Sequence, residues 1–239
     1  MDTTHNTKHY VILIRHGERS DFKGLVPQFG KLDPELTKHG EEQAYTAGQL
    51  LSDELTQMKI DPKTTKIRLI SSPFVRTLQT SRNVLKGIID KGTYQVSPTI
   101  NIDYYLSEMI GEEFRDEYPI QCLNFINQND LFKEEFKHET FNVLSKDTST
   151  LPNYVETEPM CEERMKKYIE HIIPELSENK EYNITLLVSH GEPINEMNKH
   201  LGYKGPYGWR PIKYCNTFYY EINTSSKESA FLNKVIPPQ

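Results

Sequence analysis

An apolar run that stops at a cluster of basic side chains constrains this chain more than any other stretch. Residues 10–14 read Tyr-Val-Ile-Leu-Ile, which is typical of a strand buried on both faces of a parallel sheet. Arg15, His16 and Arg19 follow closely. Ligands of open α/β sheets bind beyond the carboxyl ends of the strands. We therefore expect an anion pocket at this strand end, with His16 as a candidate nucleophile toward a bound phosphate.

Composition places the chain among ordinary globular proteins. Of its 239 residues, 36% are hydrophobic and 26% are charged, and no apolar run reaches the length of a membrane span. The formal net charge of -6 argues against a general nucleic-acid surface. Residues 1–9 lack the apolar core of a signal peptide, so we expect a cytoplasmic or nuclear protein. We expect a single domain over residues 1–239 and leave a homodimer or a protein complex open.

The cysteines point away from two kinds of site. Cys122, Cys161 and Cys215 are odd in number and widely spaced, which indicates reduced thiols rather than a disulfide framework or a zinc site. No arginine follows any of them at an offset of six residues. The sequence therefore argues against a cysteine-based phosphatase loop of the Cys-x5-Arg kind.

Helical and extended patterns alternate along most of the chain. Thr37 can cap one helix, and Ser72 followed by Pro73 can open another. We expect Pro174 to kink or end a third helix. The predicted strands are 66–70, 99–105, 183–188 and, at a sheet edge, 217–222; the predicted helices are 38–58, 73–89 and 161–176, and a polar tail covers 223–229.

Residues 109–160 follow neither pattern cleanly. They mix aromatic, acidic and lysine side chains, and they contain Pro119, Pro152 and Pro159. We expect this segment to be an inserted cap or lid over the site, and loops in such positions usually shape specificity.

Four predicted strands lead into side chains that a phosphoryl-transfer site could use. Besides the first strand, 66–70 leads to Arg76, 99–105 to Glu108 and 183–188 to His190. Taken singly, Arg76 and Glu108 are more typical of solvated surface groups. Their common position after strands favours a shared site.

The motifs at these strand ends occur in a characteristic order. They are Arg15-His16-Gly17-Glu18, Leu36-x-x-x-Gly40-x-x-x-Ala44, Ser71-Ser72-Pro73-x-x-Arg76-x-x-x-Thr80 and Ser189-His190-Gly191. This set resembles the histidine phosphatase superfamily, also called the phosphoglycerate mutase-like family, from residue 10 to about residue 220, with only the cap unmatched. The resemblance implies a three-layer α/β/α sandwich with a mostly parallel sheet and an inserted cap. It also implies a phosphohistidine intermediate on His16 and no metal or other cofactor.

The resemblance further implies a role for each basic residue. Arg15, Arg76 and Arg19 would hold phosphate oxygens by charge-assisted hydrogen bonds, and His190 would add another donor. Elementary chemistry agrees, because neutral imidazole is a competent nucleophile and nearby arginines disfavour its protonated form.

Two carboxylates compete for the role of general acid, which must protonate the leaving oxygen and later activate water. Glu108 occupies the place where the mutase-like branch carries its acid. Glu192 occupies the place where the acid phosphatase branch carries its acid, just after the second histidine. We favour Glu108 and keep Glu192 as the alternative.

The residue after the first motif separates subgroups of the family. Mutases resemble Arg-His-Gly-Glu-Ser-x-x-Asn, whereas this chain has Arg19 and Phe22 at the last two named positions. Arg-His-Gly-Glu-Arg is more similar to the Sts-type phosphatase domain, which acts on phosphotyrosine proteins. The resemblance thus implies a phosphatase for a phosphotyrosine protein or a small phosphomonoester. A phosphosugar mutase or bisphosphatase and an inactive scaffold module are the alternatives.

Overall fold

The computed structural model describes residues 8–112, 123–144, 155–178, 181–206, 212–223 and 225–238. None of the helices in these ranges is both long and apolar enough to cross a membrane. The strands are β1 (Lys8–Arg15), β2 (Lys66–Ser71), β3 (Gln95–Ile102), β4 (Thr140–Val143), β5 (Ile184–Ser189), β6 (Thr217–Asn223) and β7 (Ser229–Val235). The helices are α1 (Lys38–Gln57), α2 (Val75–Lys91), α3 (Asn124–Asn127), α4 (Asp130–Glu135), α5 (Glu158–Glu178) and α6 (Gly191–His200), with 3-10 turns η1 (Asp21–Lys23) and η2 (Tyr104–Leu106).

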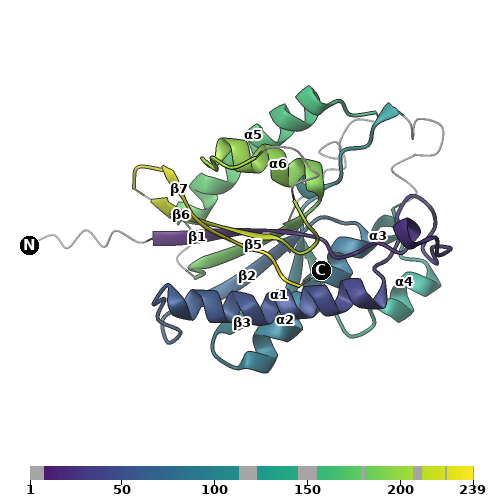
Figure 1. Cartoon of the computed structure of the whole chain (residues 1–239), viewed down its shortest axis with the longest axis horizontal. Coiled ribbons are helices and arrows are strands. Elements are labelled where there is room, and N and C mark those ends of the chain that lie inside the picture. Colours follow the sequence, from purple (N-terminus) through teal and green to yellow (C-terminus); the bar gives the residue numbers. More distant parts are fainter. Residues whose placement is uncertain are drawn as a thin grey trace, which may run out of the picture.

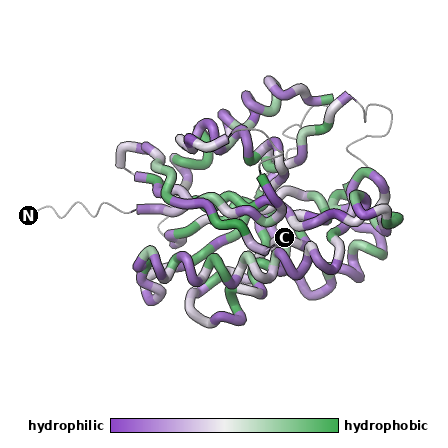
Figure 2. Tube along the Cα trace, in the orientation of Figure 1, coloured by the Kyte–Doolittle hydropathy of each residue, from purple (hydrophilic) through white to green (hydrophobic). Residues whose placement is uncertain are grey.

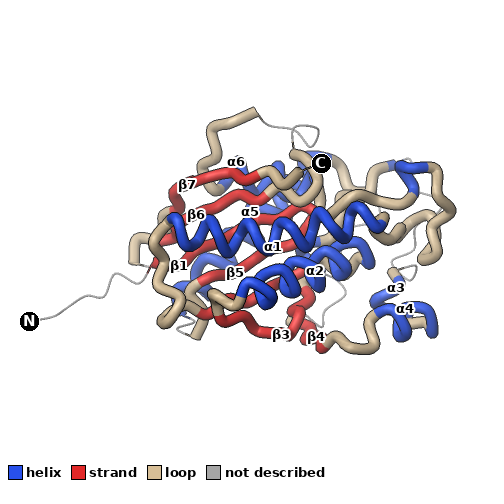
Figure 3. The backbone as a smooth tube through the Cα atoms, turned by 60° about the horizontal axis from the view of Figure 1, so that its bottom comes forward, coloured by secondary structure: helices blue, strands red, loops and turns tan. Residues whose placement is uncertain are grey.

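The strands form one sheet in the order β4-β3-β2-β5-β1-β6-β7. The five strands from β4 to β1 are parallel, β6 pairs antiparallel with β1, and β7 pairs antiparallel with β6. Helices α1 and α2 cover one face, and α5 and α6 cover the other (Figures 1 and 3). This arrangement confirms the predicted three-layer α/β/α fold with a mostly parallel sheet.

The side chains of β1 point alternately to the two faces of the sheet, which explains why its apolar run is continuous. Ile12 and Ile14 pack into the core under α1 and α2, whereas Val11 and Leu13 pack into the core under α5 and α6. Successive strand side chains point to opposite faces, so a strand between two helix layers must be apolar at every position. Figure 2 shows the same contrast between the apolar strands at the centre and the striped helices outside.

Two glycines let α1 and α2 approach each other closely. A Cβ atom on Gly48 would lie 2.2 Å from the carbonyl oxygen of Val84, and one on Gly87 would lie 2.2 Å from that of Tyr45. Both distances are far shorter than a van der Waals contact. The two helices therefore pack backbone to backbone at this crossing, and their relative position fixes the start of α2 beside the site.

The structure corrects several predicted boundaries. The helix expected from Pro73 begins at Val75. The predicted cap of the first helix is confirmed, since the Thr37 hydroxyl accepts a hydrogen bond from the Gly40 amide at 2.9 Å. The third strand starts and ends earlier, at 95–102, and passes into η2. Pro174 does not end α5, which continues to Glu178.

The predicted C-terminal edge strand is wrong in one respect, because β6 lies between β1 and β7. The polar stretch after β6 is a turn: the Asn223 side-chain oxygen accepts hydrogen bonds from the amides of Ser225 and Ser226. The chain then returns as β7. Side chains that are exposed and partly buried alternate at the start of this strand, so it contains no continuous apolar run. This is why the sequence pattern did not reveal it.

The segment expected to be a lid also contributes to the main sheet. Its residues 113–122 and 145–154 lie outside the described ranges, and Cys122 is among them. Strand β4 pairs in parallel with β3 and forms the sheet edge. Together with α3, α4 and the residue after α4, strand β4 forms an aromatic cluster, which packs on the core under α1 and α2 and consists of Phe125, Phe132, Phe136 and Phe141. The single-domain assignment stays a prediction.

The packing of α1 on α2 gives a prediction with a definite sign. In a solvated helix, glycine to alanine stabilises by about 1 kcal/mol. We expect Gly48→Ala instead to lower the free energy of unfolding by about 2 kcal/mol, because the new methyl group overpacks the crossing. Urea unfolding followed by circular dichroism measures the change. Gln57→Ala, at the exposed end of α1, is the control and should shift stability by less than about 0.5 kcal/mol; a stabilised Gly48→Ala variant would contradict the packing.

Candidate active site

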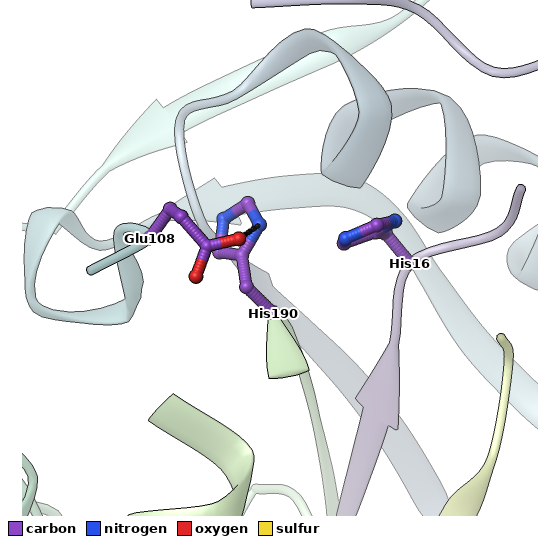
Figure 4. Close-up of side chains that lie close together, drawn as sticks. All are labelled: His16, Glu108 and His190. Carbon is purple, nitrogen blue, oxygen red and sulfur yellow. Dashed lines mark ion pairs between the residues drawn. The ribbon is translucent and has the colours of Figure 1, made fainter. Parts of the chain in front are cut away.

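Three side chains that are far apart in the sequence meet at the carboxyl ends of the parallel strands. His16 follows β1, His190 follows β5, and Glu108 lies just after η2. Each offers one ligand-type atom, and these atoms all lie within 4.8 Å of one another. The two imidazole rings are 5.3 Å apart between centroids. Figure 4 shows Glu108 and His190 in contact and His16 facing them across a short gap.

The hydrogen bonding of His16 determines which ring nitrogen can react. Nδ1 lies 2.8 Å from the carbonyl oxygen of Gly17, and a carbonyl can only accept, so Nδ1 carries the proton. Nε2 then holds the lone pair. The ring is 1% exposed, and burial, with Arg76 and Arg15 nearby, holds the pKa of His16 well below its usual value of 6.5. His16 is therefore neutral and nucleophilic at physiological pH.

His190 links the carboxylate to the start of α2. Its Nδ1 lies 3.4 Å from Oε2 of Glu108, and its Nε2 lies 2.8 Å from the hydroxyl of Ser72. Among the described residues Nδ1 has no hydrogen-bond partner, so when the serine hydroxyl donates to Nε2 the Nδ1 proton is available to a bound oxyanion. Burial and the neighbouring Arg76 lower the pKa of His190 well below its usual value. The ring therefore offers a donor to the site without adding a full charge.

The three predicted arginines have different surroundings. Arg76 is 2% exposed, and its guanidinium lies 3.4 Å from Oε2 of Glu108 and 3.7 Å from Oδ1 of Asp33. Arg15 donates to the carbonyl of Ile212 and lies over the ring of Tyr214. Both guanidiniums lower the pKa of His16, because their charge disfavours its protonated form.

Arg19 is more exposed than Arg76 and already has an acidic partner. Its guanidinium donates to both carboxylate oxygens of Asp21, at 2.6 and 3.0 Å, and lies 4.4 Å from the centroid of Phe22. With Arg76 and Glu108 it lines a small pocket, whose other lining residues are Lys31, Leu32, Phe74, Met109 and Ile110. Its predicted role as a phosphate ligand requires the guanidinium to turn from Asp21 or to share its donors with a bound anion.

Two glycines explain the close packing of the first loop. A Cβ atom on Gly17 would lie 2.4 Å from the carbonyl oxygen of Gly40, and one on Gly40 would lie 2.4 Å from that of Glu18. The Gly17 amide also donates to the Thr80 hydroxyl at 3.0 Å. The loop after His16 is therefore fixed by backbone contact with the start of α1 and by a hydrogen bond to α2.

Glu192, the alternative acid, lies in the first turn of α6. Its carboxylate accepts a hydrogen bond from Asn195 at 3.3 Å. Burial and the nearby Glu196 raise the pKa of Glu192 to about 7. Among the described side chains, the cluster within 4.8 Å contains Glu108 and not Glu192, so geometry favours Glu108.

The cluster of His16, Glu108 and His190 has the donor set of a divalent-cation site. The charges around it favour a different ligand. Arg76 contacts Glu108 directly, and Arg15 acts on His16. Two guanidiniums repel a metal ion and attract an anion, so the geometry fits a phosphoryl group better than a cation.

Sequence reasoning missed Asp33, which organises the start of α2. Its buried carboxylate accepts from the Val75 amide at 2.8 Å and from the Asn124 side chain at 3.1 Å, and it lies beside Arg76. Burial raises the pKa of Asp33, and the adjacent Arg76 opposes this shift. No local pattern marks this residue, because its partners lie 42 and 91 positions away.

Comparison with known proteins agrees with the fold. No curated protein sequence matches the chain. Similar solved structures include a mycobacterial glucosyl-3-phosphoglycerate phosphatase, with 17% identity, a TM-score of 0.52, and coverage of 94% of this chain and 97% of that one. A phosphoserine phosphatase from Entamoeba histolytica, in complex with 3-phosphoglyceric acid, has 18% identity, a TM-score of 0.52, and coverage of 95% and 96%. A phosphoglycerate mutase from Bacillus anthracis has 16% identity, a TM-score of 0.58, and coverage of 97% and 95%.

These identities are low, so the structural likeness shows the fold alone. The family assignment comes from the sequence profile of the histidine phosphatase superfamily (branch 1), which matches residues 11–235. The finer likeness to Sts-type domains stays a prediction. The matched region contains both histidines, Arg76 and Glu108. Because the profile matches most of the chain, the chain belongs to the histidine phosphatase superfamily.

Proposed function

We propose that the protein is a phosphomonoester hydrolase that works through a phosphohistidine on His16. One observation carries this proposal: His16 Nε2 has its lone pair available, and Glu108, His190 and two arginines surround it. A nucleophile, an acid and anion-binding groups therefore meet at one point. We assign Arg15, Arg76 and Arg19 to phosphate binding.

In the first step, Nε2 of His16 attacks phosphorus and forms an N–P bond. The ester P–O bond breaks, and the leaving oxygen takes the proton of the Glu108 carboxyl group. Arg15 and Arg76 stabilise the negative charge on the transferring phosphoryl oxygens, and Nδ1–H of His190 donates to one of them. The Nδ1–H bond to Gly17 keeps the imidazole oriented while positive charge develops on the ring.

In the second step, the Glu108 carboxylate takes a proton from water as the water oxygen attacks phosphorus. The N–P bond breaks, and its electron pair returns to Nε2 of His16. Inorganic phosphate leaves, and Glu108 is again protonated. The same carboxyl group thus acts first as acid and then as base.

The pocket beside the cluster bears on the substrate. Its walls combine apolar side chains with Arg19 and Lys31, which suits a phosphomonoester whose organic group is partly apolar and partly anionic. We propose a phosphotyrosine protein or a small phosphomonoester as substrate. The similar structures include both phosphatases and a mutase. Among these activities we propose the phosphatase reaction, in which the phosphoryl group is transferred to water rather than to a sugar.

The central test is turnover of p-nitrophenyl phosphate in the presence of a chelator. We expect hydrolysis without added metal, inhibition by vanadate, and an acid-labile, base-stable phosphoenzyme. His16→Asn should lower kcat by roughly 10³-fold or more, because it removes the nucleophile. No turnover by pure, folded wild-type protein would instead favour a scaffold module, and transfer to a sugar in preference to water would favour a mutase.

The choice between the two acids can be tested by paired substitutions. Glu108→Gln keeps the side-chain shape but removes the proton, and we expect it to lower kcat on phenyl phosphate by about 10²- to 10⁴-fold. Glu192→Gln is the matched control and should change kcat little, since its carboxylate lies outside the cluster. Steady-state rates decide between them. The reverse pattern would assign the acid to Glu192.

The neutral state of the two histidines also predicts a pH dependence of stability. The pKa values of His16 and His190 are lowered in the folded state, so below pH 6.5 the unfolded chain binds protons that the folded chain does not. Stability should therefore fall with decreasing pH, by up to about 1.4 kcal/mol per pH unit for each histidine. Urea unfolding between pH 7 and 5 measures the slope. His16→Asn should reduce it, whereas substitution of the exposed His39 should reduce it less; equal effects would contradict the argument.

A further inference from the structure

Glu108 lies on a segment that has no strand ladder to hold it. Strand β3 ends at Ile102, η2 ends at Leu106, and Glu108 follows outside any helix or strand. Its carboxylate must nevertheless stay within 3.4 Å of both His190 Nδ1 and the Arg76 guanidinium. Something outside the segment must therefore fix its backbone.

Arg164, on α5, supplies much of this support. Its Nη1 donates to the carbonyl of Tyr105 and, at 3.1 Å, to that of Ser107. The carbonyl between them, on Leu106, accepts from the Ser189 hydroxyl at 2.7 Å. All three carbonyls that precede Glu108 are thus held by side chains from α5 and β5.

Glu156 completes the arrangement on the other side of Glu108. Its carboxylate accepts two hydrogen bonds from Arg164, at 2.7 and 2.6 Å, and its backbone amide donates to the carbonyl of Ile110 at 2.7 Å. Arg164 and Glu156 are 8% and 3% exposed. A buried ion pair is weak evidence for stability alone, because the desolvation of both charges offsets much of their attraction.

We propose that Arg164 and Glu156 are positioning residues that hold the general acid Glu108 in line with His16. This inference rests on the proposed function, in which Glu108 protonates the leaving oxygen. The guanidinium fork contacts the backbone before Glu108, and Glu156 contacts the backbone after it, so the pair brackets the acid from both sides. A shift of about 1 Å in a catalytic group can lower a rate by roughly 10²-fold.

A purely structural ion pair makes a different prediction from a positioning pair. Loss of a structural pair would lower the folded fraction and reduce every rate equally. Loss of acid positioning would slow the first phosphoryl transfer only for substrates whose leaving oxygen needs a proton. Phenyl phosphate needs that proton, whereas 2,4-dinitrophenyl phosphate releases a phenolate that is stable without it.

The experiment compares kcat/KM, which reports the first phosphoryl transfer and not the later hydrolysis of the phosphoenzyme, on these two substrates for wild type, Arg164→Lys, Arg164→Met and Glu156→Gln, each assayed well below its melting temperature. We expect Arg164→Met to lower kcat/KM on phenyl phosphate by about 10²-fold and to change kcat/KM on the dinitrophenyl ester far less. Arg164→Lys should recover part of the loss. If Arg164→Met does not fold, Glu156→Gln and Arg164→Lys carry the same comparison.

Arg68→Met is the matched control. Arg68 is also buried and also pairs with a glutamate of α5, Glu175, at 3.1 Å, but on strand β2 away from Glu108. This variant should reduce both rates equally or neither. Equal losses on both substrates for the Arg164 and Glu156 variants, or the same selective loss for Arg68→Met, would overturn the proposal.

Failure of the proposed function has a separate signature. In that case the wild-type protein turns over neither ester, or Glu108→Gln shows no preference between them, and the positioning role falls with it. If wild type and Glu108→Gln behave as expected while the Arg164 variants do not, only the positioning role is wrong.

Discussion

The parallel pairing of β1 with β5 is the constraint on which the site depends. Its register sets Arg15 opposite Ser189, and the His16 amide donates to the Ser189 carbonyl at 3.0 Å. Both strands therefore end together, and the next residue on each is a histidine. A slip of one residue would turn these side chains to opposite faces of the sheet. Helices on both faces bury residues 11–14 of β1 and so fix that register.

Charge at this sheet edge is divided between two kinds of group. Arg15 and Arg76 carry positive charge that cannot be titrated away at physiological pH, while burial keeps the neighbouring His16 and His190 neutral. The arginines can therefore bind an anion while an imidazole keeps a free lone pair. Asp33 lies beside Arg76 and offsets part of its charge. A buried charge is costly unless a neighbouring group of opposite charge compensates it.

Buried polar contacts fix the positions of the loops that the sheet does not hold. Asp33 joins the start of α2 to Asn124, and Arg164 joins the segment before Glu108 to Glu156. These contacts link loops to rigid elements at the points where a reacting group must be held. They explain how a site assembled from four separate strand ends can have a defined geometry.

Local patterns were sufficient to predict the strands β1, β2 and β5, the capped helix α1, and the strand-end positions of His16 and His190. Apolar periodicity and capping are short-range properties, so they can be read from neighbouring residues. The edge strands β4 and β7 escaped because half-exposed strands carry a weak pattern. Asp33 and Arg164 escaped because their partners are distant in the sequence. The sequence by itself thus determined the chemical groups and the layer architecture. Tertiary structure alone decided that Glu108 rather than Glu192 joins the histidines, because only packing brings a carboxylate to within 3.4 Å of His190.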